Sequence, residues 1–224
     1  MIENILFDLD GTLTDSKIGI IRSIQFSLEH FNVTVPDENL LTWCIGPPLK
    51  DSFSQILKTT DSSILDKALF RYRKRYAKTG IFENRVYPGV ASSLRKIHQS
   101  ELRMFLATAK PQIFAKQILD HFNLSHFFTT IYGSELDGRL TDKSELISHI
   151  LETERLDPRV SLIVGDRIHD LAGGKENDLM TAAATYGYGS REEIDSAAPD
   201  FSLETFADLL SLLKTPVITD QAAR

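Results

Sequence analysis

The chain has 224 residues, 42% hydrophobic and 25% charged, with a formal net charge of -6 at pH 7. This composition is ordinary for a globular protein and excludes an intrinsically disordered chain, because enough apolar surface is available to bury. The length fits one large domain or a core with a small insertion. Without a basic excess, nothing favours a nucleic acid polymer or an anionic membrane as partner.

Cys44 is the single cysteine, so no disulfide can form within the chain, and a reducing compartment is the simplest expectation. No segment approaches the ~20 consecutive apolar residues that cross a bilayer. The amino terminus also lacks a basic region followed by a long apolar stretch. We therefore expect a cytoplasmic protein with no membrane partner.

The first predicted element is a strand over residues 2–9, within which Ile5-Leu6-Phe7 is continuously apolar. Such a run is typical of a strand covered on both faces, as in the parallel sheet of an α/β domain. Asp8 and Asp10 stand at the carboxyl end of this strand with one residue between them, so their side chains are expected on the same side. Ligands of open α/β sheets bind beyond the carboxyl ends of the strands, which makes this pair a candidate site.

The next segment carries helical rather than strand patterns. Helices are expected over residues 18–31, 38–43 and 49–58, and a fourth begins after its cap, Asp61. Gly46-Pro47-Pro48 interrupts the segment before the third of these helices. The fourth has an apolar stripe opposite a row of basic residues that includes Arg73, and we interpret this row as a solvated face. Linkers to the rest of the chain are expected near residues 14–17 and 82–88.

From Tyr87 onward, predicted strands alternate with predicted helices. The expected strands cover residues 104–109, 127–132, 160–164 and 180–185. The expected helices cover residues 90–98, 113–122, 144–154 and 202–213, with a short one after Asp170. This alternation implies parallel strands joined by right-handed crossovers, so the predicted fold class is α/β.

Three further polar clusters lie at or just past predicted strand ends. Thr108 and Ala109 precede a helix start, where a hydroxyl and free backbone N–H groups can bind an anion. Lys143 stands at a helix start, where the helix dipole disfavours a cation, so another group should hold it there. Asp166 and Asp170 follow the strand 160–164, and a pair of carboxylates suits Mg²⁺, which prefers oxygen ligands.

Each cluster also has a purely structural interpretation. Thr108 can cap the helix after Pro111, and a lysine such as Lys143 is more often a solvated surface charge. Lys110 is the rival of Lys143 as the cation beside such an anion, and its proximity to Thr108 also suits a second cation there. His169 lies between the two later aspartates, but imidazole is a poor ligand for Mg²⁺, which favours a structural or surface role.

The segment Asp8-Leu9-Asp10-Gly11-Thr12 resembles the first motif of the haloacid dehalogenase superfamily of phosphohydrolases. The clusters at Thr108, at Lys143 and at 165–170 resemble its second, third and fourth motifs, in family order. The context of Lys143 and the segment Ile45-Gly46-Pro47-Pro48-Leu49 resemble phosphoglycolate-phosphatase-like members. Alternatively, the latter segment is only a proline-stiffened turn.

This resemblance implies a Rossmann-like parallel sheet core with helices on both faces and an inserted α-helical cap domain. Residues 1–15 and 83–215 would form the catalytic core, and residues 16–82 the cap. Residues 216–224 are polar and expected to form a flexible tail. In the superfamily, the cap closes over the site and selects the substrate.

The resemblance also implies the chemistry, a Mg²⁺-dependent hydrolysis of a small phosphorylated metabolite through an aspartyl-phosphate. Asp8 would be the nucleophile and Asp10 the general acid and base. The implied phosphate-binding residues are Gly11, Thr12, Thr108, Ala109 and Lys143. The implied ligands of Mg²⁺ are Asp8, Asp10 through its backbone carbonyl, and Asp166, while Asp170 would belong to the metal site through water or through contact with a ligand. Phosphoglycolate and a nucleoside monophosphate are candidate substrates, and the oligomeric state is not predicted.

Asp10 also bears on the other functions of the same fold. The dehalogenases and phosphonate hydrolases of the superfamily lack this aspartate, which disfavours both. A sugar phosphomutase stays open, because Asp10 would serve there too. A non-catalytic binding protein is the remote alternative, since every catalytic position is filled. A dinucleotide-binding dehydrogenase is disfavoured because no Gly-x-Gly-x-x-Gly follows the first strand.

Overall fold

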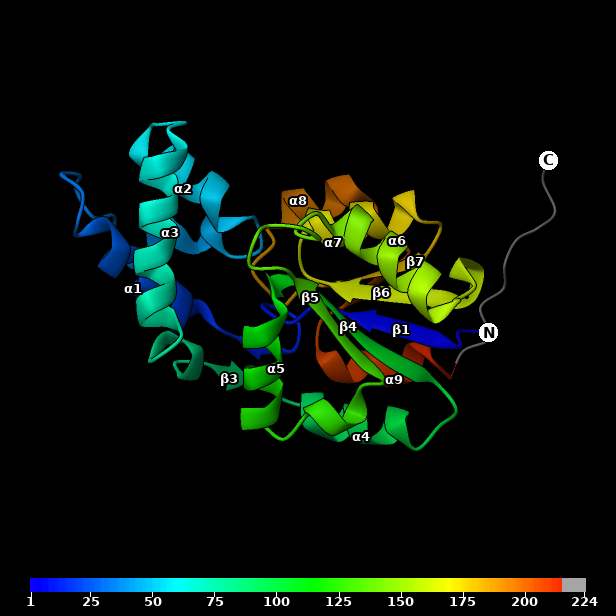
Figure 1. The fold of residues 1–224 in the computed structure, drawn as a ribbon. Helices are drawn as coiled ribbons and strands as arrows, with labels where there is room; N and C mark the ends of the chain where they lie inside the picture. The colour runs from blue at the N-terminus through cyan, green and yellow to red at the C-terminus, as the bar shows by residue number, and fades with distance from the viewer. Residues whose placement is uncertain (215–224) are drawn as a thin grey trace.

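A six-stranded parallel sheet forms the centre of the computed structural model, which describes residues 1–214 (Figure 1). The strand order is β5-β4-β1-β6-β7-β8 and every neighbouring pair is parallel. The strands are β1 (Asn4–Phe7), β4 (Arg103–Pro111), β5 (Thr130–Ser134), β6 (Ser161–Gly165), β7 (Met180–Ala184) and β8 (Phe201–Leu203). The predicted α/β class is confirmed.

Helices cover both faces of this sheet (Figure 1). On one face lie α4 (Val90–His98), α5 (Gln112–His121) and α9 (Leu209–Leu212). On the other lie α6 (Lys143–Glu154), α7 (Ile168–Glu176) and α8 (Arg191–Ala197). Short 3₁₀ turns in this part of the chain are η3 (Ser125–Phe127), η4 (Pro158–Val160) and η5 (Phe206–Asp208).

The continuous apolar run of β1 is explained by this double cover. Ile5 and Phe7 pack into the larger core cluster, together with side chains of α4 and α5. Leu6, between them, points to the opposite face and packs in a second cluster with Leu146 of α6. Successive side chains of a strand alternate between the two faces, so a central strand with helices on both sides needs apolar residues at every position.

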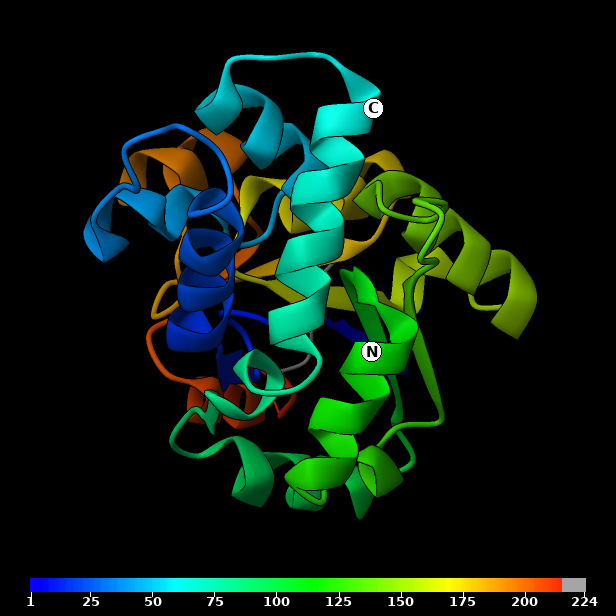
Figure 2. The same cartoon turned by 60° about the vertical axis from the view of Figure 1, so that its left-hand side comes forward.

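The helical segment between β1 and β4 stands beside the carboxyl edge of the sheet (Figures 1 and 2). It contains α1 (Lys17–Leu28), η1 (Glu38–Cys44), α2 (Leu49–Leu57), α3 (Ser62–Tyr76) and η2 (Gly80–Phe82). Helices α1 and α3 pack together, and the buried Ser27 hydroxyl donates to the Ala68 carbonyl at 2.7 Å. Among residues 1–214, no helix combines the length and apolarity needed to cross a membrane.

The chain enters and leaves the helical segment through one antiparallel pair of short strands, β2 (Thr14–Asp15) and β3 (Arg85–Val86). An ion pair of 2.7 Å joins Arg85 Nη2 to Asp15 Oδ2 across the pair. Both strands lie within the stretches expected to be linkers. The two linkers between the helical segment and the rest of the chain are therefore paired with each other.

Some predicted elements were wrong. The expected helix 202–213 begins as β8, which pairs with β7 through Phe201 and Ala182, and only η5 and α9 are helical there. The expected strand 127–132 starts at Thr130, after η3. Helix α7 was expected after Asp170 but begins at Ile168. The elements β2, β3 and α8 were not predicted. Strands this short are defined by their pairing partners and carry no readable periodicity. The expected tail, 216–224, lies outside the described residues.

Replacing Phe105 by Ala should lower the free energy of unfolding by ~3–5 kcal/mol, because this β4 side chain is fully buried and its loss leaves a cavity. Urea unfolding followed by circular dichroism measures the change. Phe70 of α3 is 69% exposed, so Phe70→Ala should change stability by no more than ~0.5 kcal/mol. Equal losses in the two variants would contradict this assignment of the core.

Candidate active site

The expected site residues gather at the carboxyl ends of the adjacent strands β4, β1 and β6, beside a cavity of about 530 Å³. From the sheet side, Asp8, Asp10, Thr108 and Lys143 line this cavity. The helical segment lines its other side, with Tyr72 among its side chains. Parallel pairing brings together residues that lie up to about 160 positions apart, because the strand ends coincide.

Lys143 is a buried cation of the site. It is the first residue of α6, and its Nζ lies 2.7 Å from Asp8 Oδ1 and 2.6 Å from Asp170 Oδ1. It also donates to the Ala107 carbonyl at 2.7 Å. Burial by itself would lower the pKa of Lys143, but the charges of Asp170 and Asp8 raise it above its ordinary value. These acceptors explain a cation at a helix start, where the dipole opposes it.

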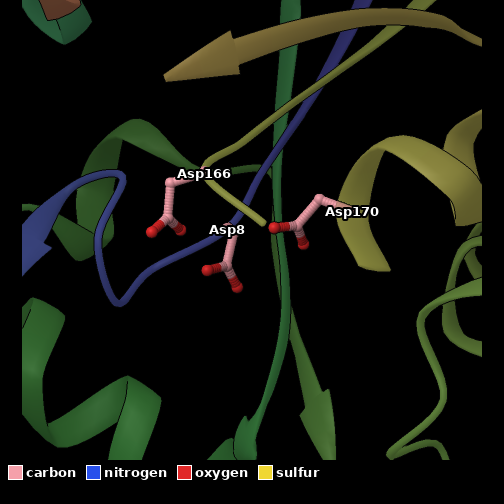
Figure 3. A group of neighbouring side chains, drawn as sticks. All are labelled: Asp8, Asp166 and Asp170. Carbon is pink, nitrogen blue, oxygen red and sulfur yellow. The ribbon is translucent and has the colours of Figure 1, made fainter. Parts of the chain in front are cut away.

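Three buried carboxylates, those of Asp8, Asp166 and Asp170, bring oxygen atoms within 4.8 Å of one another (Figure 3). Burial raises the pKa of Asp166 well above its ordinary value, and the charges of Asp8 and Asp170 raise it further. Lys143 offsets only one of the three charges. An all-oxygen donor set that retains excess negative charge fits Mg²⁺. The Asp10 carboxylate is not part of this group, and the ligand expected from Asp10 is its backbone carbonyl.

Gly11 and Thr12 surround Asp166. Gly11 has a φ of +85°, and a Cβ built on it would lie 2.1 Å from Asp166 Oδ2, so any side chain there would displace the carboxylate. The Thr12 hydroxyl donates to Asp166 Oδ1 at 3.4 Å, and the Tyr188 N–H donates to Asp166 Oδ2 at 2.7 Å. Neither Gly11 nor Thr12 is among the residues that line the cavity. Their expected contact with phosphate stays a prediction, whereas their contact with Asp166 is direct.

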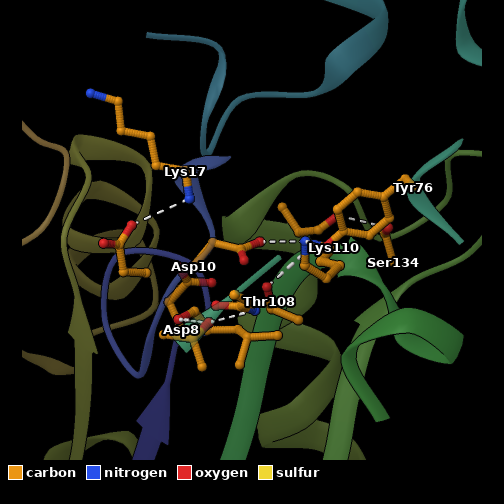
Figure 4. A network of polar contacts seen from close by, with 12 residues as sticks. Asp8, Asp10, Lys17, Tyr76, Thr108, Lys110 and Ser134 are labelled. Atoms are coloured by element: carbon orange, nitrogen blue, oxygen red, sulfur yellow. Dashed lines mark hydrogen bonds and ion pairs between the residues drawn. The ribbon is translucent and has the colours of Figure 1, made fainter. Parts of the chain in front are cut away.

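The second expected cluster lies at the end of β4, where Thr108 is buried against the cavity. Its Oγ1 accepts a hydrogen bond from the Lys110 N–H at 3.3 Å, so the hydroxyl proton stays available for an anion. The Ala109 carbonyl accepts from the Ser134 hydroxyl at 2.8 Å. Lys110 also lines the cavity, but its Nζ lies 2.7 Å from Asp10 Oδ2 (Figure 4). The two rival lysines thus pair with different aspartates.

The helical segment contributes to the cavity in two ways that bear on the sequence expectations. The Gly46-Pro47-Pro48 turn lines the cavity, which favours the interpretation that it approaches the site. Arg73 was expected on a solvated face, and this was wrong for that residue. From α3, its side chain lines the cavity and donates to the carbonyl of Leu136, a residue after β5, at 3.1 Å.

Sequence reasoning missed three side chains near the site: Tyr76, Arg167 and Tyr188. The Arg167 Nε lies 2.8 Å from Glu193 Oε1, and its Nη1 donates to the Ile45 carbonyl of the helical segment. No local pattern announces Tyr76 or Arg167. For Tyr188 a signal existed in its flanking glycines, since a Cβ on either would fall within 2.3 Å of an Asp166 atom. Such a pair can mark a close approach of backbone to a site.

Fold and site together define an α/β protein whose acidic pocket, with its buried lysine, opens at the carboxyl edge of a parallel sheet. The chain belongs to the haloacid dehalogenase-like hydrolases, because the sequence model of that family matches residues 5–184. This confirms the family expected from the motifs.

Named relatives and a solved structure agree with this membership. The chain is 41% identical over 212 residues to a 5'-nucleotidase of Pseudomonas aeruginosa, covering 95% of this chain and 96% of that protein. It is 28% identical over 214 residues to a phosphoglycolate phosphatase of Aquifex aeolicus (96% and 98%). It is 32% identical to tyrosine-protein kinase PtkA of Mycobacterium tuberculosis over 194 residues, which is 87% of this chain and 66% of that protein. A crystal structure of a predicted phosphatase from Clostridium acetobutylicum superposes with a TM-score of 0.91, at 36% identity, covering 96% of this chain and 100% of that one.

Replacing Asp166 by Asn should stabilise the metal-free protein, because it removes a buried charge while the amide can still bond to Tyr188 and Thr12. In chelator at pH 7 we expect a gain of at least ~1 kcal/mol, or ~2–4 °C in melting temperature. Adding Mg²⁺ should raise the melting temperature of the wild type much more than that of the variant. The exposed replacement Asp120→Asn is the control and should leave the response to Mg²⁺ unchanged.

The advantage of Asp166→Asn should also depend on pH. The pKa of Asp166 is raised in the fold, so on acidification the folded wild type takes up a proton before the unfolded chain does. The wild type in chelator therefore gains stability relative to the variant as the pH falls from neutral through this raised pKa. An advantage that grows on acidification would contradict the assignment.

Proposed function

We propose that this phosphoric monoester hydrolase requires Mg²⁺ and works through an aspartyl-phosphate formed on Asp8. The observation that carries the proposal is the buried Lys143, which contacts Asp8, Asp170 and the Ala107 carbonyl of β4 at once. A carboxylate beside a buried ammonium can approach a phosphate dianion with less repulsion than an isolated carboxylate would meet. Relatives named 5'-nucleotidase and phosphoglycolate phosphatase support phosphate monoesters as the substrate class.

The proposed reaction has two steps. In the first, an Asp8 oxygen attacks phosphorus in line, the bond from phosphorus to the leaving oxygen breaks, and Asp10 gives that oxygen a proton. In the second, water attacks phosphorus, Asp10 accepts a proton from it, and the bond between phosphorus and Asp8 breaks to release phosphate. Thr108 and Lys143 would hold the phosphoryl oxygens through both steps.

The metal has a place in this scheme at the carboxylates of Asp8, Asp166 and Asp170, with the Asp10 backbone carbonyl as a further ligand. When bound there, Mg²⁺ would offset the repulsion between carboxylates and phosphate and orient the phosphoryl group. The excess negative charge of this buried cluster supports the assignment. Gly11 and Thr12 would act in the same place by shaping the environment of Asp166.

We propose that residues 16–82 act as the cap of the catalytic core formed by residues 1–15 and 83–215. In support, the cavity is lined from both parts of the chain, and β2 and β3 pair where the chain passes between them. A cap that covers the site would exclude bulk water and strengthen every charge interaction inside it. We propose that the protein acts in the cytoplasm, in agreement with its single cysteine and with a phosphorylated metabolite as substrate.

The cavity favours a substrate larger than phosphoglycolate. Its volume of about 530 Å³ falls in the ~300–1,000 Å³ range of sites that enclose drug-sized ligands. Apolar and aromatic side chains, among them Leu49, Phe70 and Phe114, line it away from the aspartates. A two-carbon acid would leave these side chains without a partner, whereas a nucleoside 5'-monophosphate offers a planar aromatic base whose face can stack on them. We propose nucleoside monophosphates as the substrate class.

The nucleophile is tested by phosphate release from a panel of metabolites with Mg²⁺, comparing the wild type with Asp8→Asn. The variant should lose more than ~10³-fold in kcat, because the neutral amide that replaces the carboxylate is too weak a nucleophile to form the covalent intermediate. Thermal melts of both proteins control for folding. Equal activity of the two proteins would remove Asp8 as the nucleophile.

The same panel tests the substrate class. We expect kcat/KM for nucleoside 5'-monophosphates to exceed that for phosphoglycolate by at least ~10-fold, about 1.4 kcal/mol of differential binding in the transition state. A higher value for phosphoglycolate would contradict the argument from the cavity. NMR of sugar 1-phosphates tests the mutase alternative, since conversion to the 6-phosphate without phosphate release would make the protein a phosphomutase.

A further inference from the structure

Lys110 is a buried cation that the reaction above leaves without a task. Its side chain is 6% exposed, and its Nζ lies 2.7 Å from Asp10 Oδ2. The same ammonium donates to the Tyr76 hydroxyl at 2.8 Å and lies 4.7 Å from the centre of the Tyr76 ring. Burying an ammonium costs free energy unless acceptors replace water, and here the acceptors are an acid of the site and a residue of the helical segment.

The backbone is built to aim Lys110 at Asp10. Pairing between β4 and β5 shifts register between Thr108 and Pro111, and such an irregularity can redirect a side chain at the end of a strand. On β5, Gly133 lies opposite Thr108, and a Cβ added to Gly133 would lie 2.6 Å from the Lys110 carbonyl oxygen. A glycine is therefore required at position 133 for the irregular end of β4 to pack against β5.

Tyr76 is fixed as firmly as Lys110. It is the last residue of α3 and is 1% exposed. Its ring stacks on Tyr72 at 5.3 Å with an interplanar angle of 11°. Its other neighbour is Phe114 of α5, which meets it edge to face at 5.6 Å. The hydroxyl that receives Lys110 is thus held between the helical segment and the sheet domain.

The two oxygens of Asp10 differ in consequence. Oδ2 is paired with Lys110, whereas Oδ1 is buried and has no hydrogen-bond partner within residues 1–214 (Figure 4). A buried acceptor without a partner is unfavourable unless a ligand supplies one. Asp10 lines the cavity, so the ligand able to supply it is the substrate or the attacking water.

We infer that Lys110 is a positioning residue for Asp10: it holds Oδ2, leaves Oδ1 to exchange the proton, and through Tyr76 ties this arrangement to helix α3. The inference rests on the proposed function, because it presumes that Asp10 transfers a proton to the leaving oxygen. It differs from the interpretation of Lys110 as a second cation for phosphate. In that case Lys110 would bind the phosphoryl group of every ester equally.

The leaving group separates these roles. p-Nitrophenolate is a weak base and leaves readily without a proton, whereas the alkoxide that leaves adenosine 5'-monophosphate or phosphoglycolate needs one. We therefore compare Lys110→Met with the wild type by kcat/KM, which reports the step in which the leaving group departs. The variant should lose at least ~10-fold on the two alkyl esters and less than ~3-fold on p-nitrophenyl phosphate.

Four further variants complete the experiment. Asp10→Asn is the benchmark and should show the same asymmetry, with a larger loss. Tyr76→Phe keeps the ring and removes the hydroxyl, so it should lose activity selectively on alkyl esters but less than Lys110→Met. Adding Tyr76→Phe to Lys110→Met should cost little more, because the two side chains act as one unit. Lys116→Met, on the exposed side of α5, is the matched control and should leave both substrate classes unchanged.

The possible failures are distinguishable. Equal losses on aryl and alkyl esters in Lys110→Met, or no loss on either, overturn the inference if Asp10→Asn retains its asymmetry. If Asp10→Asn also lacks the asymmetry, the proton-transfer role of Asp10 fails first. If the wild type releases phosphate from none of the esters, the proposed function itself fails. Should Lys110→Met not fold by circular dichroism, Tyr76→Phe decides, and its failure to discriminate between ester classes overturns the inference.

Discussion

The contact of Lys143 with Asp8 and Asp170 is the interaction on which the site depends. The fold brings the buried carboxylates of Asp8, Asp166 and Asp170 together at adjacent strand ends, and like charges so placed repel strongly in a medium of low dielectric. Lys143 offsets part of this charge from the start of α6, where the helix dipole opposes its presence. The ion pairs with these carboxylates therefore explain why a lysine lies at this helix start. A divalent cation would complete the compensation that one ammonium leaves unfinished.

The two aspartates at the end of β1 differ in environment because different lysines hold them. Asp8 pairs with Lys143 and belongs to the acidic cluster, while Asp10 pairs with Lys110 outside it. This division suits a reaction in which one carboxylate attacks and the other moves protons. Since Lys110 also contacts Tyr76, the second pair lies on the boundary between the sheet and the helical segment. The arrangement offers a physical route by which α3 could influence Asp10, the proposed proton-transfer group.

Much of the sheet could be predicted because its central strands are short, continuously apolar and followed by polar clusters. Ile5, Leu6 and Phe7 must be apolar at every position, since β1 is covered on both faces. The edge strand β8 could not be predicted in the same way, because its three residues are defined by pairing with β7. The gathering of Asp8, Thr108 and Asp166 could be predicted because family motifs stand at strand ends, and that of Lys143 because its motif begins the helix α6. Tyr76 and Arg167 could not be predicted, because their contacts cross from one part of the chain to another.

The sequence by itself determined the α/β class, the family and the identity of the residues that meet at the sheet edge, because periodicity and motif spacing are local properties of a chain. Only the tertiary structure decided which lysine holds which aspartate, since Lys110 and Lys143 both suit a phosphate on chemical grounds. It also placed Thr12 against Asp166 and Arg73 against the cavity. Such pairings depend on the positions of side chains in space. These positions are set by the strand ends, by the shifted register of β4 against β5 and by the packing of α3. No window of the sequence contains that information.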